Sequence, residues 1–211
     1  MAIKDDREYR NLGLLELETR EQDEQGGNEP SFFVEGYAST FEPYKLLSFD
    51  GVDYYERIEP TAFANTDMSD VVFLRDHEGR VLARTKNGTI ELSVDNIGLH
   101  TRTDLGKTGA SREMYEDIQA RNYSQMSFSF VVDDDEYEEE THTRVIKSIK
   151  KLYDISAVAF PANPGTNIGL SMRDYFDGAI ERAQAERLAA ERQAQAIEKL
   201  KLKIKLGGIN K

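Results

Sequence analysis

The stretch SQMSFSFVV, residues 124–132, decides the fold class. Small hydroxyl residues alternate in it with Met and Phe, which is the two-residue period of a β-strand with one apolar face. Ser127 and Ser129 fall on one face, and Met126 and Phe128 fall on the other. Serine hydroxyls on such a strand need hydrogen-bond partners when they are buried. Pairing across the sheet is one explanation, and contact between one serine and an imidazole is the other.

Comparable strand-like runs lie before and after this stretch. We expect strands at residues 71–75, 81–86, 89–94, 98–105, 125–133, 143–150 and 152–160. Turn signals such as Asn87-Gly88 and Asp95-Asn96 separate several of them. Strands this close together, with one or two inserted helices, predict a mainly β (α+β) domain. We expect it to form a small barrel or curled sheet, not a βαβ fold.

One helix is expected between the strands. Thr108 or Ser111 is suited to cap it, because a side-chain oxygen at that position accepts a hydrogen bond from a free N–H group of the first turn. Met114, Ile118 and Arg121 follow at helical spacing.

The N-terminal region is more polar than the β-rich centre. The acidic stretch EQDEQGGNEP, residues 21–30, predicts a loop that ends in Gly and Pro. It is suited to the tip of a hairpin with arms at residues 12–19 and 31–39, because both arms have a strand-like composition.

The C-terminal region changes character. Residues 171–206 consist mainly of Ala, Glu, Gln, Arg, Lys and Leu, and their apolar residues keep a three- or four-residue spacing. This pattern predicts a long helix. We therefore expect a β domain at residues 1–170 and a helical tail at residues 171–211. The tail is either a free solvated helix or a helix that binds a partner.

The composition excludes several kinds of site. The 211 residues contain no Cys, which excludes disulfides, thiolate zinc sites and cysteine nucleophiles. A net charge of -12 disfavours nucleic acid as a partner. No apolar run of about 18 residues is present to span a membrane. The N-terminus lacks the apolar stretch of a signal peptide, so we expect the protein to stay in the cell that makes it.

The chain has only three histidines, and they are the candidates for acid–base chemistry. His77 ends an apolar strand in FLRDHEGRVLART, where the chain turns. It is either a general base held by rigid structure or an ordinary exposed loop histidine. The histidines form no HExxH motif or other short ligand pair, so we expect no metal and no other cofactor.

His142 follows the acidic run DDDEYEEE, residues 133–140. Such a run could hold a hard cation, but it lacks the glycine turn and ligand spacing of an EF-hand loop. A solvated hairpin tip is therefore the favoured interpretation.

Asp154 interrupts an otherwise apolar strand in KLYDISAVAF. A buried carboxylate costs free energy unless it is paired or hydrogen-bonded. It either forms a salt bridge with an arginine or lysine, or it orients an imidazole and stabilises the imidazolium form.

From about Gly36 to Thr166 the chain resembles the prohead proteases of tailed phages, a family related to the assemblins of herpesviruses. The resemblance is carried, in order, by GYAST, ERIEPTAF, FLRDHEGRVLART, NGTIELSVDNIGLH, MSFSF and DISAVAFPANP. The order and spacing of these motifs make it specific. It implies a small closed or nearly closed β-barrel flanked by helices.

By position, the resemblance implies Ser127 as nucleophile, His77 as base and Asp154 as third member of a catalytic set. The third member is commonly Glu in the phage enzymes and His in the herpesvirus relatives. Asp154 departs from both patterns, so His142 is an alternative. Ser129 is the alternative nucleophile because it shares the face of Ser127. Backbone N–H groups of Ala162, Asn163 or Gly165 are expected to stabilise the oxyanion.

The resemblance implies a serine endopeptidase that acts inside the assembling prohead, in the host cytoplasm. Its implied partners are a scaffold protein, the major capsid protein or its scaffolding segment, and a second copy of itself, but no nucleic acid and no membrane. It would cleave the scaffold and its own tail. A non-catalytic capsid-assembly module of the same fold is the alternative, and an acidic β-domain that binds cations is a third hypothesis.

Overall fold

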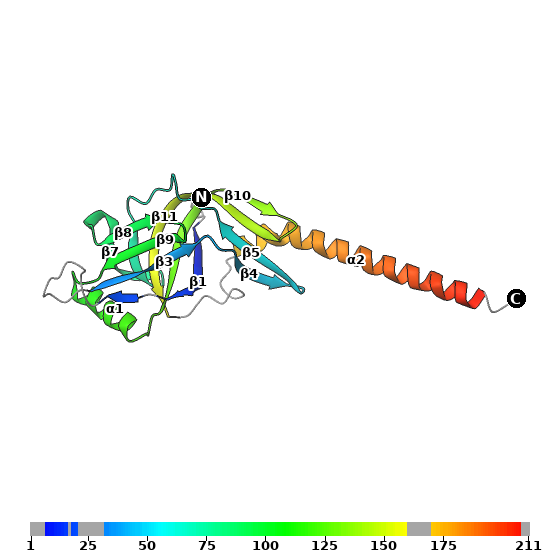
Figure 1. The fold of residues 1–211 in the computed structure, drawn as a ribbon, viewed down its shortest axis with the longest axis horizontal. Helices are drawn as coiled ribbons and strands as arrows, with labels where there is room; N and C mark the ends of the chain where they lie inside the picture. Colours follow the sequence, from blue (N-terminus) through cyan, green and yellow to red (C-terminus); the bar gives the residue numbers. More distant parts are fainter. Residues whose placement is uncertain (1–6, 17, 21–31, 160–169, 208–211) are drawn as a thin grey trace. The chain divides into compact units, whose positions relative to one another are not determined.

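The computed structural model describes residues 7–16, 18–20, 32–159 and 170–207. The chain divides into two compact units, residues 1–167 and residues 168–211, and each is considered by itself. The first unit is mainly β with helix α1 (Gly109–Gln119), and the second contains helix α2 (Leu170–Gly207) (Figure 1).

The strands of the first unit form two sheets. The larger sheet runs in the order β1 (Glu8–Glu16), β10 (Gln125–Glu138), β11 (Thr143–Val158), β5 (Val52–Ile58) and β4 (Tyr44–Phe49). The hairpin of β6 (Val72–Arg75) and β7 (Glu78–Arg84) joins it by pairing with β11. The smaller sheet runs β2 (Glu18–Arg20), β3 (Phe33–Thr40), β9 (Gly98–Asp104) and β8 (Ile90–Val94).

The mainly β fold with helices, including a C-terminal one, is confirmed. A barrel is not confirmed, because the strand order closes neither sheet on itself within the described residues.

The strand that carries the MSFSF motif is buried on its apolar face as predicted. Met126, Phe128 and Phe130 lie in one core with Ile155 and Ala157 of the neighbouring strand β11. The rings of Phe128 and Phe130 stack with their centroids 4.7 Å apart. Burying this many apolar side chains stabilises the β10–β11 pair and leaves its other face for polar groups.

Strand β11 is one strand where the sequence predicts two. Its first residues pair in parallel with β5, and residues Asp154–Ala157 pair in parallel with Val72–Arg75 of β6. Its last residues also pair with the first residues of β10. β11 therefore brings the end of β6 and the start of β10 to the same end of the sheet.

The predicted N-terminal hairpin was wrong in part. Residues 18–20 pair with residues 33–35, but the rest of the expected first hairpin arm forms β1, which pairs with β10 instead. The acidic loop at 21–30 lies outside the described residues. The prediction also missed the hairpin of β4 and β5.

The acidic run at residues 133–140 is not simply a hairpin tip. Its residues up to Glu138 continue β10, and the turn follows them. The carboxylates of Asp135, Glu136 and Glu138 form ion pairs, and their partners are Arg144, Lys147 and Arg57. Basic side chains thus offset three of the charges of the run, and residues 133–138 extend as part of the sheet.

Helix α1 begins as the sequence predicts. The Thr108 side chain accepts a hydrogen bond from the Ser111 N–H over 3.1 Å, which satisfies one of the free N–H groups of the first turn. Met114 and Ile118 are buried, whereas Arg121 lies beyond the helix. The helix contacts β2 and β7 (Figure 1).

Helix α2 extends over 38 residues and confirms the predicted C-terminal helix. A short 3-10 turn, η1 (Thr85–Asn87), follows β7 and ends at Gly88, whose φ is 72°. Within the described ranges, the helices lack an apolar segment long enough to cross a membrane.

Candidate active site

One face of the β10–β11 pair carries polar side chains at every second residue. Ser127 lies directly opposite Ser156, and Ser129 lies directly opposite Asp154. All four residues are at most 2% exposed. Buried polar groups need hydrogen-bond partners, so these side chains must find theirs among each other and in neighbouring segments.

His77 lies in the two-residue turn between β6 and β7. Both turn residues have left-handed backbone angles, with φ 48° at Asp76 and 61° at His77. Positive φ at both central residues is the mark of a type I′ hairpin turn, and Asp and His adopt it more readily than most other residues with a Cβ atom.

The turn is fixed to the end of β11 by two hydrogen bonds. The Asp76 N–H donates to the Ala157 carbonyl over 3.0 Å. The Ala159 N–H donates to the Asp76 carboxylate over 3.3 Å. The backbone of the turn therefore has a defined position relative to β11.

The His77 ring bridges two strands of the sheet. Its Nε2 atom lies 2.5 Å from the Ser127 Oγ atom of β10, and its Nδ1 atom lies 2.6 Å from the Asp154 Oδ1 atom of β11. The structure thus brings together the three residues that the resemblance selects, although 50 residues separate His77 from Ser127. A carboxylate only accepts hydrogen bonds, so Nδ1 carries a proton and Nε2 of the neutral ring is an acceptor.

Two further hydroxyls surround the Asp154 carboxylate. Ser129 donates to its Oδ2 atom, and Ser156 donates to its Oδ1 atom over 2.9 Å. Burial alone would raise the pKa of the Asp154 carboxyl. The hydrogen bond and charge of His77, together with the two hydroxyls, outweigh burial and lower that pKa below its ordinary value. Asp154 is therefore ionised at neutral pH.

Strand β1 completes the site from the other side of β10. The rings of Tyr9 and His77 meet edge to face, with their centroids 4.8 Å apart. The Arg10 carbonyl lies 2.8 Å from the Ser127 Oγ atom and accepts a hydrogen bond from it. Sequence reasoning missed these contacts because no local pattern indicates that β1 pairs with β10.

Sequence reasoning also missed Ser156, although a signal was present. Ser156 follows Asp154 at the two-residue spacing of a strand and so shares its face. Besides its bond to Asp154, its hydroxyl lies 3.3 Å from the Nδ1 atom of His77.

The alternative third member, His142, is not brought to Ser127. It lies in the turn between β10 and β11, whereas Ser127 lies near the other end of the strand pair. The Nδ1 atom of His142 lies 3.1 Å from the Tyr137 hydroxyl.

The alternative nucleophile, Ser129, faces the same side as Ser127 but bonds to Asp154. Its hydroxyl is thus engaged by the carboxylate, while the Ser127 hydroxyl contacts the imidazole. The predicted oxyanion residues Ala162, Asn163 and Gly165 lie outside the described residues.

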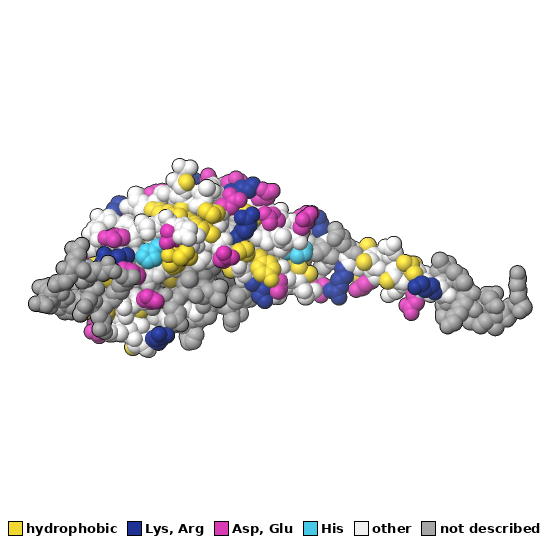
Figure 2. Space-filling model, in the orientation of Figure 1, with side chains coloured by type: hydrophobic (Ala, Val, Ile, Leu, Met, Phe, Trp, Pro, Cys, Tyr) yellow, Lys and Arg dark blue, Asp and Glu magenta, His cyan; other side chains and the backbone are white. Residues whose placement is uncertain are grey.

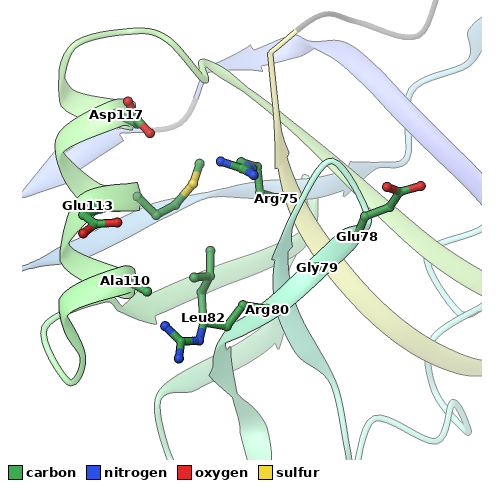
Figure 3. Close-up of a pocket in the computed structure, with 9 residues that line it drawn as sticks. Arg75, Glu78, Gly79, Arg80, Leu82, Ala110, Glu113 and Asp117 are labelled. Carbon is green, nitrogen blue, oxygen red and sulfur yellow. The ribbon is translucent and has the colours of Figure 1, made fainter.

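A cavity of about 200 Å³ opens beside the turn that carries His77 (Figure 3). Leu82, Ala110 and Met114 form its apolar part. Charged side chains of the hairpin and of α1 surround it: Arg75, Glu78, Arg80, Glu113 and Asp117. Arg75 and Glu78 directly precede and follow the Asp76-His77 turn, whereas His77, Ser127 and Asp154 are not among the lining residues.

The described residues contain no group of three or more His, Asp or Glu side chains that could hold a metal ion. On the face shown in Figure 2, acidic and basic side chains are interspersed among the described residues.

Comparison with known protein families gives one match. A model of the caudovirus prohead serine protease family matches residues 15–178. That range includes His77, Ser127 and Asp154. Neither a curated protein nor a solved structure matches the chain.

Proposed function

The chain belongs to the family of caudovirus prohead serine proteases, and from this premise we propose that it is an endopeptidase in which Ser127, His77 and Asp154 act together. Membership implies serine protease activity and a role in phage capsid maturation. The proposed substrates are the scaffold, or the scaffolding segment of the major capsid protein, and the chain itself, inside the assembling prohead. A kinship with the herpesvirus assemblins is part of the same proposal.

The observation that carries the proposal is that the two ring nitrogens of His77 contact two different groups, Ser127 Oγ at 2.5 Å and Asp154 Oδ1 at 2.6 Å. A neutral ring with its proton on Nδ1 takes the Ser127 proton at Nε2 while Oγ attacks the peptide carbonyl. The protonated ring then gives this proton to the leaving amine as the C–N bond breaks. Water releases the acyl group with His77 again as base.

Asp154 has a different task in this mechanism. Its carboxylate keeps the Nδ1 proton in place and stabilises the imidazolium that forms when Ser127 loses its proton. The lowered pKa of Asp154 supports this role, because the carboxylate must stay ionised while it is buried.

The oxyanion of the tetrahedral intermediate needs N–H donors. We propose Ala162, Asn163 or Gly165 as their source, because these residues follow β11 shortly after Asp154 and the intervening Pro161 and Pro164 have no N–H. Removing one such donor typically raises the barrier by about 3–4 kcal/mol.

The cavity beside the turn is a suitable subsite for one substrate side chain. It combines an apolar base of Leu82, Ala110 and Met114 with a charged rim, as sites that bind peptide side chains often do. Its rim residues Arg75 and Glu78 flank the turn of the proposed base, so a peptide bound there would pass close to His77.

Helix α2 is proposed to bring the protease into the growing shell by pairing with scaffold helices. Its described side chains include Arg187 and Glu191, which form an ion pair at i,i+4, and Leu188 and Ile197, which are about half exposed. A long helix with apolar side chains among charges is suited to helix pairing. Removing residues 172–211 is expected to reduce incorporation into proheads, while Ser127 keeps its reactivity.

The decisive experiment is labelling with a fluorophosphonate, which reacts with activated serines, followed by mass spectrometry. We expect the adduct on Ser127, and we expect Ser127→Ala to abolish both labelling and self-cleavage of the full chain. A folded wild-type protein that is neither labelled nor able to cleave would instead favour the non-catalytic assembly module.

A further inference from the structure

The Ser127 hydroxyl has one proton to donate, and two neighbouring atoms can accept it. The Nε2 atom of His77 lies 2.5 Å from Oγ, and the Arg10 carbonyl oxygen lies 2.8 Å from it. A hydroxyl donates only one hydrogen bond at a time. When the proton points to Arg10, the imidazole cannot accept it, so the two acceptors compete.

The side chain of Arg10 holds this carbonyl in place. Its guanidinium is 6% exposed and forms two bonds to the fully buried Glu56 carboxylate, one from Nη2 over 2.8 Å and one from Nε. It also bonds to Glu8 of the same strand. The charge of these carboxylates raises the pKa of Arg10 although burial alone would lower it.

Other residues extend this buried cluster. Arg144 of β11 bonds to Glu8 over 2.7 Å and to Glu56 over 3.1 Å. The Tyr44 hydroxyl donates to Glu56 over 2.5 Å. The cluster thus connects β1 with β4, β5 and β11. Burying so many charges costs free energy unless every member keeps its partners, so the cluster favours one defined position of β1.

Strand β1 lies directly beside the nucleophile, which is buried. The regular pairing of β1 with β10 reaches Asn11, opposite Ser127, and the next pair joins Glu16 to Gln125. Ser127 is 2% exposed. A peptide carbonyl can therefore reach Oγ only if a neighbouring segment moves.

We propose that Arg10 is a positioning residue that holds Ser127 in a resting state: its carbonyl accepts the hydrogen bond of the Ser127 hydroxyl, and its buried guanidinium keeps β1 beside the nucleophile. This inference rests on the proposed role of Ser127. The bond to Arg10 exists before the attack and is lost when Oγ gives up its proton. An interaction present only in the ground state raises the barrier.

The test measures the rate of fluorophosphonate labelling of the full chain. In Arg10→Met we expect labelling to be about three- to tenfold faster, which corresponds to losing one neutral hydrogen bond. Arg10→Lys, which keeps a charge in the cluster, should restore most of the slower wild-type labelling rate.

Two further variants keep the result interpretable. Arg10→Met combined with Glu56→Gln removes one positive and one negative charge and so keeps the net charge of the buried cluster unchanged, if the single variant does not fold. Arg57→Met removes an arginine of the same sheet that pairs with Glu138 and should change nothing. Folded Arg10 variants labelled no faster than wild type would overturn the resting-state proposal, whereas absence of labelling in wild type and in every folded Arg10 variant would overturn the proposed function.

Discussion

Ser129 and Asp154 face each other across the β10–β11 pair, and the Ser129 hydroxyl donates to the Oδ2 atom of the carboxylate. The Oδ1 atom of the same carboxylate contacts His77. Ser129 therefore contacts the carboxylate that bonds to the imidazole and does not itself reach the imidazole.

Replacing Ser129 by Ala is expected to slow peptide cleavage without abolishing it. A hydrogen bond to a charged group contributes about 1.5–3 kcal/mol, so kcat should fall by about one to two orders of magnitude. Fluorophosphonate should still react at Ser127. The exposed Ser93→Ala is the control, and loss of all labelling in Ser129→Ala would mean that Ser129 is the nucleophile.

Replacing Asp154 by Asn is expected to reduce kcat by about three to four orders of magnitude, because an amide favours the wrong imidazole tautomer. Circular dichroism should show an unchanged β content. The exposed Asp67→Asn serves as control. Activity within tenfold of wild type would remove Asp154 from the mechanism.

The same variant should change the acid dependence of stability. The pKa of Asp154 is lowered in the folded chain, so its ionised form stabilises the fold above its unfolded-state pKa. This contribution is lost as the pH falls through the folded-state pKa. The difference in unfolding free energy between wild type and Asp154→Asn should therefore shrink as the pH falls below about 4, the ordinary pKa of an aspartate, in urea titrations. A constant difference would contradict the lowered pKa.

The left-handed backbone of His77 predicts an unusual order of stability. At φ 61° a side chain with a Cβ atom is strained, which costs roughly 1 kcal/mol relative to glycine. His77→Gly should therefore be more stable than His77→Ala by about this amount, measured by denaturant unfolding. Both variants should be inactive. Equal stability would mean that the turn relaxes when the imidazole is removed.

Filling the cavity should separate peptide binding from nucleophile reactivity. Ala110→Trp places a large side chain among Leu82 and Met114. We expect kcat/KM for peptide cleavage to fall at least about tenfold, as expected when a well-fitted side-chain contact is lost. Labelling of Ser127 by a small fluorophosphonate should stay unchanged. Ala120→Trp, after the end of α1, is the control, and unaffected peptide cleavage in Ala110→Trp would exclude the subsite.

Local sequence patterns predicted many of the strands and both helices but missed β4 and β5. In β5, Glu56 is buried between Tyr54 and Ile58 on the same face. A charged residue at a core position hides the alternation on which strand prediction depends. The turn Asp50-Gly51, with φ 50° and 80°, was an available hairpin signal.

The prediction of the catalytic set needed more than local sequence patterns. Taken alone, His77, Ser127 and Asp154 each had an ordinary structural explanation, and only the resemblance linked them. The contact between Arg10 and Ser127 joins residues 117 positions apart. It depends on buried charges from β1, β5 and β11, and no pattern within a single segment encodes such a cluster.

The β10–β11 ladder contains several register shifts between Ser129 and Asp135. The number of residues between the hairpin turn and Ser127 therefore decides which side chains of β10 face the polar side of the sheet. Deleting one residue from β10 in that interval would exchange the two faces of the strand on its N-terminal side, where Ser127 lies. Met126 would then take the place of Ser127 beside the imidazole, and the hydroxyls would turn into the apolar interior. For this strand, length is as strict a requirement as chemistry.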